Sequence, residues 1–484
     1  MKTEKGISRR SSIKCLGATS ALAALGLPAN EAAEKPSVVA ARPSRADNAR
    51  QTLFERVSAT PLIDTHEHLI EEKERLRGAG PRVGCDDWAL LLSHYLDSDL
   101  ITAGMPETAH ARFFSPKTDP GEKWALLEPY WPAVKNTGYG QAVRLTVREL
   151  YEVEDLAAGT IGRVQAAYER TRRPGFYRAI LNERANIESC QVNCLTGEPF
   201  KESDQPTLLM QDISIVGMFA GPNLKTYATP TGIKVADLSD WHRVIDWWFA
   251  RYGDLAVAVK SQQAYSRDIN YAKVPAETAA PIFKQVLDGQ ILSPSARTQL
   301  EDHLFWYAVE KATAAGLPVK LHTGYYAGQN YMPPERLTHN PASAAQLCRL
   351  APETKFVFMH IGYPHYEEML SVAKHYTNAC VDMCWSWIIN PVAAKDFLKK
   401  YLVTAPANKI LTFGGDYIPV EPVLGHALIA RRGIALALAE LVEEGWIALD
   451  DALALVDPIM HGNARSMFHL EAKTAALKKV SWGK

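Results

Sequence analysis

The sequence predicts an α/β protein, a (β/α)8 barrel of the TIM-barrel type with a helical insertion after the first strand. Eight short apolar runs alternate with stretches of helical periodicity, a pattern typical of parallel strands joined by helical crossovers. Several runs end directly in histidine, lysine or aspartate, where a barrel gathers its active-site residues. A doubly wound sheet is the competing fold, but no glycine-rich phosphate loop follows the first run.

The composition suits a globular enzyme with a large core. Of 484 residues, 47% are hydrophobic and 22% are charged. The net charge is −1, with no basic block outside the N-terminal segment, so nucleic acid and anionic membranes are not expected partners. We expect a small-molecule substrate, and the sequence leaves a homo-oligomer open. Seven cysteines are too few for a disulfide scaffold in a chain of this length.

The N-terminus has the organisation of an export signal. The pair Arg9-Arg10 precedes an apolar stretch from Cys15 to Pro28 and then alanine-rich residues. Residues 1–33 are therefore interpreted as a twin-arginine signal, which an export machinery reads as an address and which is not a membrane anchor. A disordered basic tail is the alternative. Residues 34–46 are interpreted as a linker and 47–484 as the barrel, which we expect to be soluble and periplasmic or otherwise exported.

The first strand is expected at about 60–66 and ends in His66-Glu67-His68. The following residues, 70–184, have helical periodicity and many aromatic side chains. Because this insertion follows the C-terminal end of a strand, we expect it to cap the active site. The other seven strands are expected at Ile187–Val192, Ile213–Phe219, Leu255–Val259, Leu317–Leu321, Lys355–Met359, Ala379–Met383 and Ile410–Phe413. Amphipathic helices are expected between them, among them Leu238–Arg251, Ser295–Ala315 and Ala342–Leu350.

The strand ends supply candidate metal ligands. Alternate strand residues face the same side, so His66 and His68 can converge on one ion while Glu67 faces away in a structural role. Asp416 can both bind that ion and take a proton from water, whose pKa a zinc ion lowers to about 7. As the structural alternative, Asp416 would cap a helix. The polar strand ends, in chain order, are His66, His68, Lys260, His322, His360 and Asp416.

This pattern resembles the amidohydrolase superfamily of metal-dependent barrels. That superfamily carries His-x-His after strand 1, histidines after strands 5 and 6, and aspartate after strand 8, and the positions matched here are His66, His68, His322, His360 and Asp416. The barrel resemblance covers about 60–70 and 185–470. Within the superfamily, the insertion and the segment Lys260-Ser261-x-x-Ala264-Tyr265-x-Arg267 resemble uronate isomerases and their hydrolase-like relatives.

The resemblance implies a divalent metal, Zn²⁺ by preference, with Mn²⁺, Fe²⁺ and Ni²⁺ as alternatives. One ion is the default. Two ions follow if Lys260 is carbamylated, because the carbamate would bridge them and His322 and His360 would complete the second site. Otherwise Lys260 serves the substrate beside Arg267, or the two residues form a partly buried ion pair with other groups. His360 either binds metal or donates to a substrate carbonyl. Further expected substrate contacts are Tyr265, Tyr325 and Trp385.

The sequence thus favours a hydrolase that cleaves a C–O or C–N bond in a small polar substrate, such as a carboxylate-bearing ester, amide or lactone. Asp416 would shuttle the proton, with His360 and Lys260 as the other catalytic candidates. A uronate-isomerase-like aldose–ketose isomerase and a metal-dependent decarboxylase remain alternatives on the same barrel. A non-catalytic exported binding protein is the alternative of another class, and the intact ligand set argues against it.

Overall fold

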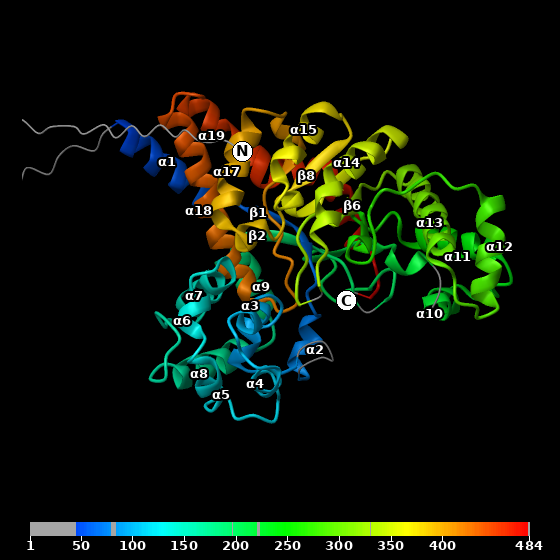
Figure 1. Ribbon diagram of the computed structural model, residues 1–484. Helices are drawn as coiled ribbons and strands as arrows, with labels where there is room; N and C mark the ends of the chain where they lie inside the picture. Colours follow the sequence, from blue (N-terminus) through cyan, green and yellow to red (C-terminus); the bar gives the residue numbers. More distant parts are fainter. Residues whose placement is uncertain (1–44, 79–83, 196, 220–222, 330, 483–484) are drawn as a thin grey trace, which may run out of the picture. The chain divides into compact units, whose positions relative to one another are not determined.

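The computed structural model describes residues 45–78, 84–195, 197–219, 223–329 and 331–482 (Figure 1). The expected signal, 1–33, and most of the expected linker lie outside these residues. The linker's last two positions belong to helix α1 (Arg45–Ala59).

Parallel strands form the barrel. The strands pair in the orders β1-β2-β3 and β4-β5-β6-β7-β8-β9. Backbone hydrogen bonds join the two sets: the Val257 amide, just before β5, donates to Gln211 O of β3 over 3.0 Å, and the Thr65 amide of β1 donates to Phe413 O, just after β9, over 3.0 Å. The segments β3 and β4 act as one barrel strand, which gives the eight of a (β/α)8 barrel. The bounds are β1 (Leu62–Glu67), β2 (Ile187–Val192), β3 (Leu209–Gln211), β4 (Ile213–Ser214), β5 (Val259–Ser261), β6 (Val319–Leu321), β7 (Phe356–Phe358), β8 (Ala379–Asp382) and β9 (Ile410–Leu411).

The third strand was misplaced in the sequence analysis. It was expected at Ile213–Phe219, whereas strand pairing begins at Leu209 and Val216–Phe219 forms the 3-10 helix η3. The polar residue Asp212 interrupts the apolar run, so the sequence pattern did not indicate a strand here. Its carboxylate is fully buried and accepts from Lys320 Nζ at 3.0 Å. A buried ion pair inside the barrel thus took the place of the apolar side chain that the pattern requires.

The insertion at 70–184 is helical, as predicted, and Figure 1 shows most of its helices gathered below β1 and β2. An ion pair ties it to the barrel helices: Arg75 Nη2 lies 2.7 Å from Glu421 Oε1, and both side chains are buried. The segments are α2 (Glu72–Leu76), η1 (Trp88–Leu92), α3 (Leu96–Thr102), α4 (Glu107–Phe113), α5 (Lys123–Leu127), α6 (Trp131–Val134), α7 (Gly138–Tyr151), α8 (Ile161–Thr171), α9 (Phe176–Arg178) and η2 (Ala179–Arg184).

Most of the remaining helices surround the strands. The three helices named as examples in the sequence analysis correspond to α11, α13 and α14. The long elements are α11 (Leu238–Tyr252), α12 (Ala276–Leu287), α13 (Pro294–Ala314), α14 (Pro334–Leu350), α15 (Tyr366–His375), α17 (Pro391–Leu402), α18 (Glu421–Glu443) and α19 (Leu449–Asp457). The short ones are α10 (Leu224–Ala228), η5 (Thr229–Thr231), η6 (Gln263–Tyr265), η7 (Met359–Gly362), α16 (Ser386–Ile389), η8 (Ala407–Lys409), η9 (Pro458–Gly462), α20 (Asn463–Met467) and α21 (Leu470–Leu477).

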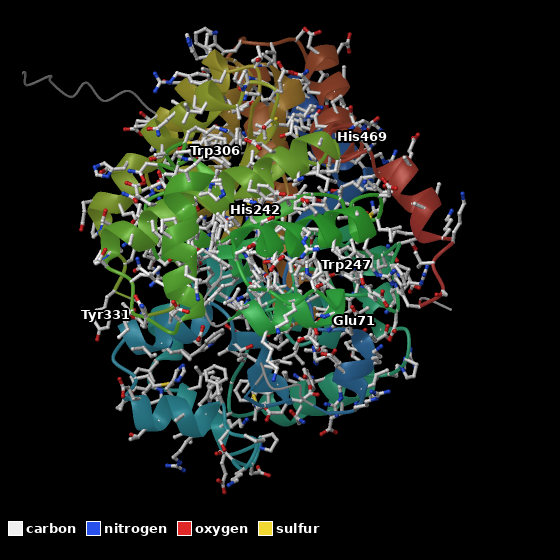
Figure 2. All side chains as sticks on the ribbon, turned by 90° about the vertical axis from the view of Figure 1, so that its right-hand side faces the viewer. Glu71, His242, Trp247, Trp306, Tyr331 and His469 are labelled. Atoms are coloured by element: carbon white, nitrogen blue, oxygen red, sulfur yellow. The ribbon has the colours of Figure 1, made fainter. Side chains whose placement is uncertain are left out.

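Helices α11 and α13 meet through a histidine pair. His242, labelled in Figure 2, stacks on Tyr307 with 3.8 Å between ring centroids. Its Nε2 lies 2.9 Å from the Nε2 of His303. Burial is the main cause that lowers the pKa of His242, to about 4, and the neighbouring His303 adds to the effect. At neutral pH His242 is therefore uncharged.

Helix α18 is long and apolar. In the part of the chain that the structure describes, it alone has the length and composition to cross a membrane. However, 83% of its most apolar stretch is buried inside the protein. Burial of this kind is what a core helix shows.

The barrel interior changes character along its axis. A small apolar cluster joins Ile63, Met210 and Val357 of the strands to Met467 and Phe468 near the C-terminus. Lys320 Nζ lies 5.0 Å from the centre of the Phe468 ring and donates to Thr65 O over 2.8 Å. Apolar packing thus fills one end of the barrel, and buried polar groups follow towards the strand ends.

Candidate metal centre

Two histidines from the end of β1 and one aspartate from the loop after β9 bring three donor atoms together. The Nε2 atoms of His66 and His68 lie 3.3 Å apart, and each is 3.2 Å from Asp416 Oδ1. Zinc–nitrogen and zinc–oxygen bonds of about 2.0–2.1 Å place tetrahedral donors about 3.3–3.4 Å apart. All three residues are buried. The donor set therefore has the spacing and chemistry to hold a divalent ion.

Backbone carbonyls fix the tautomers of two histidines. Because a carbonyl only accepts, the Nδ1–H of His68 donates to Asn193 O over 2.9 Å, and that of His360 donates to Cys384 O over 3.0 Å. Both rings therefore present a lone pair at Nε2. Burial is the main cause that lowers the pKa of His360, to about 4, so this ring is neutral at pH 7. This state favours metal binding by His360 over donation to a substrate carbonyl.

The loop after β9 passes close to the end of β1, and this contact positions Asp416. Its amide donates to His66 O over 2.9 Å, and the next amide, of Tyr417, donates to Glu67 Oε2 over 2.6 Å. A Cβ at position 415 would lie 1.9 Å from Glu67 Oε1, so only glycine fits there. Burial raises the pKa of Asp416, but the facing His66 and His68 outweigh it and leave that pKa well below its usual range. Asp416 is therefore an anion, and Glu67 has the structural role expected for it.

A cavity of about 310 Å³ opens over these donors. Lys260 lies in its wall and is 1% exposed. Burial is the main cause that lowers the pKa of Lys260, to about 8. Tyr265 also lies in the wall, and its hydroxyl accepts from the Ala327 amide over 3.1 Å. The lining residues are His68, His94, Tyr95, Leu195, Lys260, Gln262, Tyr265, His322, Ala327 and Asp416.

His322 lines the cavity but does not join the three donors. Its Nε2–H donates to Tyr325 O over 2.9 Å. Among the residues described, it belongs to neither group of side chains that are close enough to share a metal ion. Trp385 and Tyr325 do not line the cavity; Trp385 packs edge-on against His360, with 5.3 Å between centroids, and Tyr325 packs against Trp385 at 6.0 Å.

Arg267 lies outside the cavity. Its guanidinium makes ion pairs of 3.3 Å with Glu301 and 2.6 Å with Asp302, and it lies over the ring of Tyr271. The structure therefore gives Arg267 the buried ion pair that was the alternative to substrate binding. The physical reason is that α13 places the carboxylates of Glu301 and Asp302 beside it, which a pattern confined to the segment around Lys260 does not reveal.

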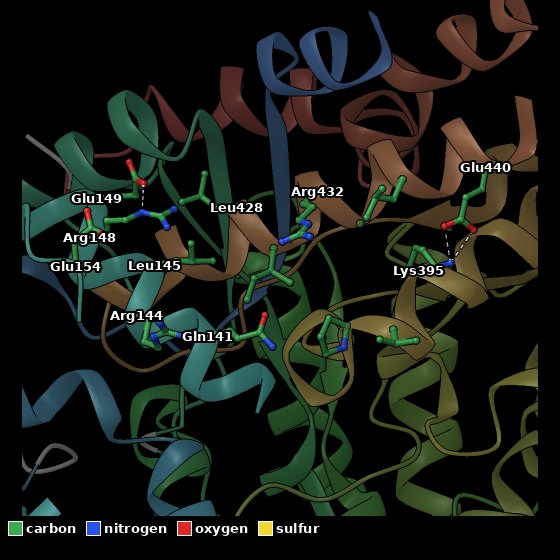
Figure 3. A pocket seen from close by; sticks show the side chains of 15 residues that line it. Gln141, Arg144, Leu145, Arg148, Glu149, Glu154, Lys395, Leu428, Arg432 and Glu440 are labelled. Atoms are coloured by element: carbon green, nitrogen blue, oxygen red, sulfur yellow. Dashed lines mark hydrogen bonds and ion pairs between the residues drawn. The ribbon is translucent and has the colours of Figure 1, made fainter. Parts of the chain in front are cut away.

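A wider cavity, of about 800 Å³, lies apart from these donors between α7, α17 and α18 (Figure 3). Its lining mixes leucines such as Leu145 and Leu428 with charged side chains such as Arg144, Arg432 and Glu440. Neither group of potential metal ligands found in the described residues belongs to it. The smaller cavity is therefore the candidate active site.

The insertion supplies two cavity residues that the sequence analysis missed, His94 and Tyr95. The Tyr95 hydroxyl donates to Asp416 O, and its ring stacks between Tyr139 and Trp385. His94 Nδ1 accepts from the Ile418 amide over 3.1 Å, so its Nε2 carries the proton. Both residues have positive φ, 59° and 154°, and they interrupt a stretch that looks helical in sequence. A histidine inside that apolar run was the available signal.

Gln262 is a further cavity residue that the sequence analysis missed. Its side-chain amide lies 3.0 Å from His68 Nε2. It follows the strand that carries Lys260, two positions further along the chain. No chemical pattern distinguishes it from any other loop glutamine.

Comparison with known proteins supports the fold. Residues 291–470 match the amidohydrolase family model. A glucuronate isomerase from Caulobacter crescentus superimposes with a TM-score of 0.70 and 17% identity, covering 91% of this chain and 97% of that one. A uronate isomerase from Thermotoga maritima gives 0.67 and 14%, covering 87% and 97%. A putative metal-dependent hydrolase from Lactobacillus casei gives 0.59 and 16%, covering 87% and 98%.

One curated relative also aligns. Protein fluG of Emericella nidulans is 25% identical over 162 residues, which is 33% of this chain and 18% of that protein. The chain therefore spans less than a fifth of the relative's length. The structural likenesses confirm the (β/α)8 barrel, and the family-model match covers the part of the chain that supplies His322, His360 and Asp416.

Proposed function

We propose that this protein is a metal-dependent hydrolase of a small polar substrate. The observation that carries the proposal is the set of three donors, His66 Nε2, His68 Nε2 and Asp416 Oδ1, separated by 3.2–3.3 Å at the barrel mouth. The partial match to the amidohydrolase family model supports it. When bound, a Zn²⁺-type ion would lower the pKa of a water molecule to about 7 and so supply a nucleophile.

The chain's own residues account for proton transfer and substrate orientation. Asp416 directs Oδ1 at the two histidines, and a further lone pair of its carboxylate takes the proton of the attacking water and returns it to the leaving group. The Nε2–H of His94 is the donor that would bind a substrate oxygen as negative charge develops on it. Tyr95 holds the backbone carbonyl of Asp416 and thereby its orientation.

The cavity favours a substrate that carries a carboxylate. Lys260 lies in the wall, and no hydrogen bond or ion pair to its Nζ is found among the residues that the structure describes. With a pKa of about 8 it is an ammonium at neutral pH. A volume of about 310 Å³ suits a small molecule. A short ester, amide or lactone with a carboxylate group meets these conditions.

Aldose–ketose isomerisation is the second candidate. Two structures similar to this chain are isomerases of uronate or glucuronate, and they cover 87% and 91% of it. Moving a proton between adjacent carbons requires acid and base groups of the protein next to the substrate. Asp416 and His94 both line the cavity. A uronate would also place its carboxylate near Lys260.

Metal content and turnover test the proposal together. The purified protein should contain about one or more equivalents of a divalent metal and hydrolyse a member of a panel of lactones, short esters and N-acyl amino acids. Isomerase activity would appear instead as ketose formation from a uronate. His66→Ala should lose metal and activity together, and His375→Ala, an exposed position on α15, is the matched control. Hydrolysis by metal-free protein would contradict the proposal.

A further inference from the structure

We propose a second metal site on the other side of the Asp416 carboxylate, with a cysteine thiolate among its ligands. The site consists of His360, Cys384 and Asp416, each of which offers one donor atom within 4.8 Å of the others. All three residues are buried. The inference rests on the metal centre of the proposed function and adds to it an ion that Asp416 would share.

The carboxylate of Asp416 has the geometry of a bridge. Its Oδ1 lies 3.2 Å from both His66 Nε2 and His68 Nε2, and its Oδ2 lies 4.0 Å from His360 Nε2. The two oxygens therefore face different sets of donors. One carboxylate could bind two ions, one through each oxygen.

His360 presents a lone pair that the described part of the chain does not use. Its Nδ1–H is committed to Cys384 O, so Nε2 carries no proton. That Nε2 is buried and has no hydrogen-bond partner among the residues described. A buried acceptor without a partner is unfavourable because it has lost its hydrogen bonds to water. Binding a cation would remove this cost.

The thiol of Cys384 lies close to the donor atoms of His360 and Asp416. Its amide donates to Asp382 Oδ1 over 2.9 Å, and Asp382 Oδ2 accepts from the Thr65 hydroxyl over 2.7 Å, so the turn after β8 is fixed. Cys384 Sγ lies against Gly414, where a Cβ would meet it at 2.9 Å. Burial raises the pKa of the thiol above its usual range, but a coordinating thiol loses its proton to the metal.

The donor set also indicates which metals it would take. Thiolate and imidazole ligands favour Zn²⁺ over Mg²⁺ or Mn²⁺. Zinc–ligand bonds of about 2.0–2.3 Å place neighbouring donors about 3.3–3.6 Å apart. The 4.0 Å between His360 Nε2 and Asp416 Oδ2 is about half an ångström wider. A small rotation of the carboxylate closes that gap.

This position differs from the one that a carbamylated Lys260 would create. A carbamate site would need His322 as a ligand, and the Nε2–H of His322 donates to Tyr325 O, which leaves only Nδ1 to bind an ion. His322 belongs to neither group of potential metal ligands in the described residues. The unused donors lie instead at the ends of β7 and β8.

Cobalt titration of the metal-free full-length protein tests the site without relying on activity. We expect two Co²⁺ ions per chain and a near-ultraviolet thiolate-to-cobalt charge-transfer band. Cys384→Ser and Cys384→Ala should each bind one ion and lose the band. Lys260→Met should keep both ions and the band. Cys348→Ser, which changes another buried thiol outside both donor groups, is the matched control.

X-ray absorption of the wild-type zinc protein provides a test that needs no variant. A zinc–sulfur distance of about 2.3 Å would support the site. One bound ion without a zinc–sulfur contact would overturn this inference and leave the proposed hydrolase standing. No bound ion at all would overturn both. Loss of the second ion in Lys260→Met, but not in Cys384→Ser, would assign that ion to a carbamate and also overturn the inference.

Discussion

The two sides of the candidate active-site cavity come from different parts of the chain and are built differently. On the barrel side, His66 and His68 lie at the end of β1 and Asp416 lies in the loop after β9, and backbone hydrogen bonds between the two segments fix their positions. On the insertion side, His94 and Tyr95 lie between η1 and α3, with positive φ angles and aromatic stacking around them.

This difference separates the residues expected to bind metal from those expected to contact the substrate. Donor atoms for an ion must be placed within a few tenths of an ångström, which adjacent strands achieve. Groups that face the substrate can come from a capping segment that changes without disturbing the barrel. The barrel side should therefore control metal binding, and the insertion side should control turnover at constant metal content.

The largest expected effect is on the barrel side. Asp416→Asn should lower kcat by about 10³-fold, within the range for loss of a general acid–base group, while part of the metal is retained through His66 and His68. Metal analysis and initial rates on the same preparation measure both. If Asp416→Asn keeps the wild-type kcat, Asp416 does not transfer the proton.

On the insertion side, His94→Ala should lower kcat by about 10²-fold because it removes one hydrogen-bond donor to developing charge. Metal content should stay at the wild-type level, which separates this side from the other. His339→Ala, at an exposed position on α14, is the control. If His94→Ala instead loses metal, the division between the two sides is wrong.

A smaller effect on activity is expected at Arg267. Arg267→Met should leave kcat and KM within about twofold, because its ion pairs with Glu301 and Asp302 lie outside the cavity. The free energy of unfolding should fall by on the order of 3 kcal/mol, as when one partner of a buried ion pair is removed. Denaturant titration and steady-state kinetics measure the two quantities. A large rise in KM would instead show that Arg267 takes part in substrate binding.

The smallest expected effect lies away from both sides, at the histidine pair of α11 and α13. The folded-state pKa of His242 is about 4, below the ordinary 6.5, so the unfolded chain binds more protons between these values. His242's contribution to stability is therefore complete above pH 6.5 and is lost as the pH falls towards 4. His242→Phe should flatten this part of the stability–pH curve. Equal slopes in variant and wild type would contradict the assignment.

Prediction from sequence was correct where neighbouring residues of one segment form the pattern by themselves. The alternation of runs predicted the barrel and the insertion, and His66-x-His68 follows the first strand as a contiguous motif. The strand at Leu209–Ser214 was predicted at the wrong position because its buried Asp212 pairs with Lys320, which is far away in the sequence. The partners of Arg267, and the approach of His94 and Tyr95, likewise depend on tertiary contacts that no local pattern contains.

The closure of the barrel has a consequence for the order of events during synthesis. The Tyr417 amide bonds to Glu67, 350 positions earlier, and Phe468 near the C-terminus packs against strand residues from β1 onwards. While the ribosome is still making the second half of the chain, the two histidines of β1 have no aspartate to meet. The three donors of the candidate metal centre can therefore meet only after nearly the whole polypeptide has emerged, and an ion held by all three would bind after synthesis.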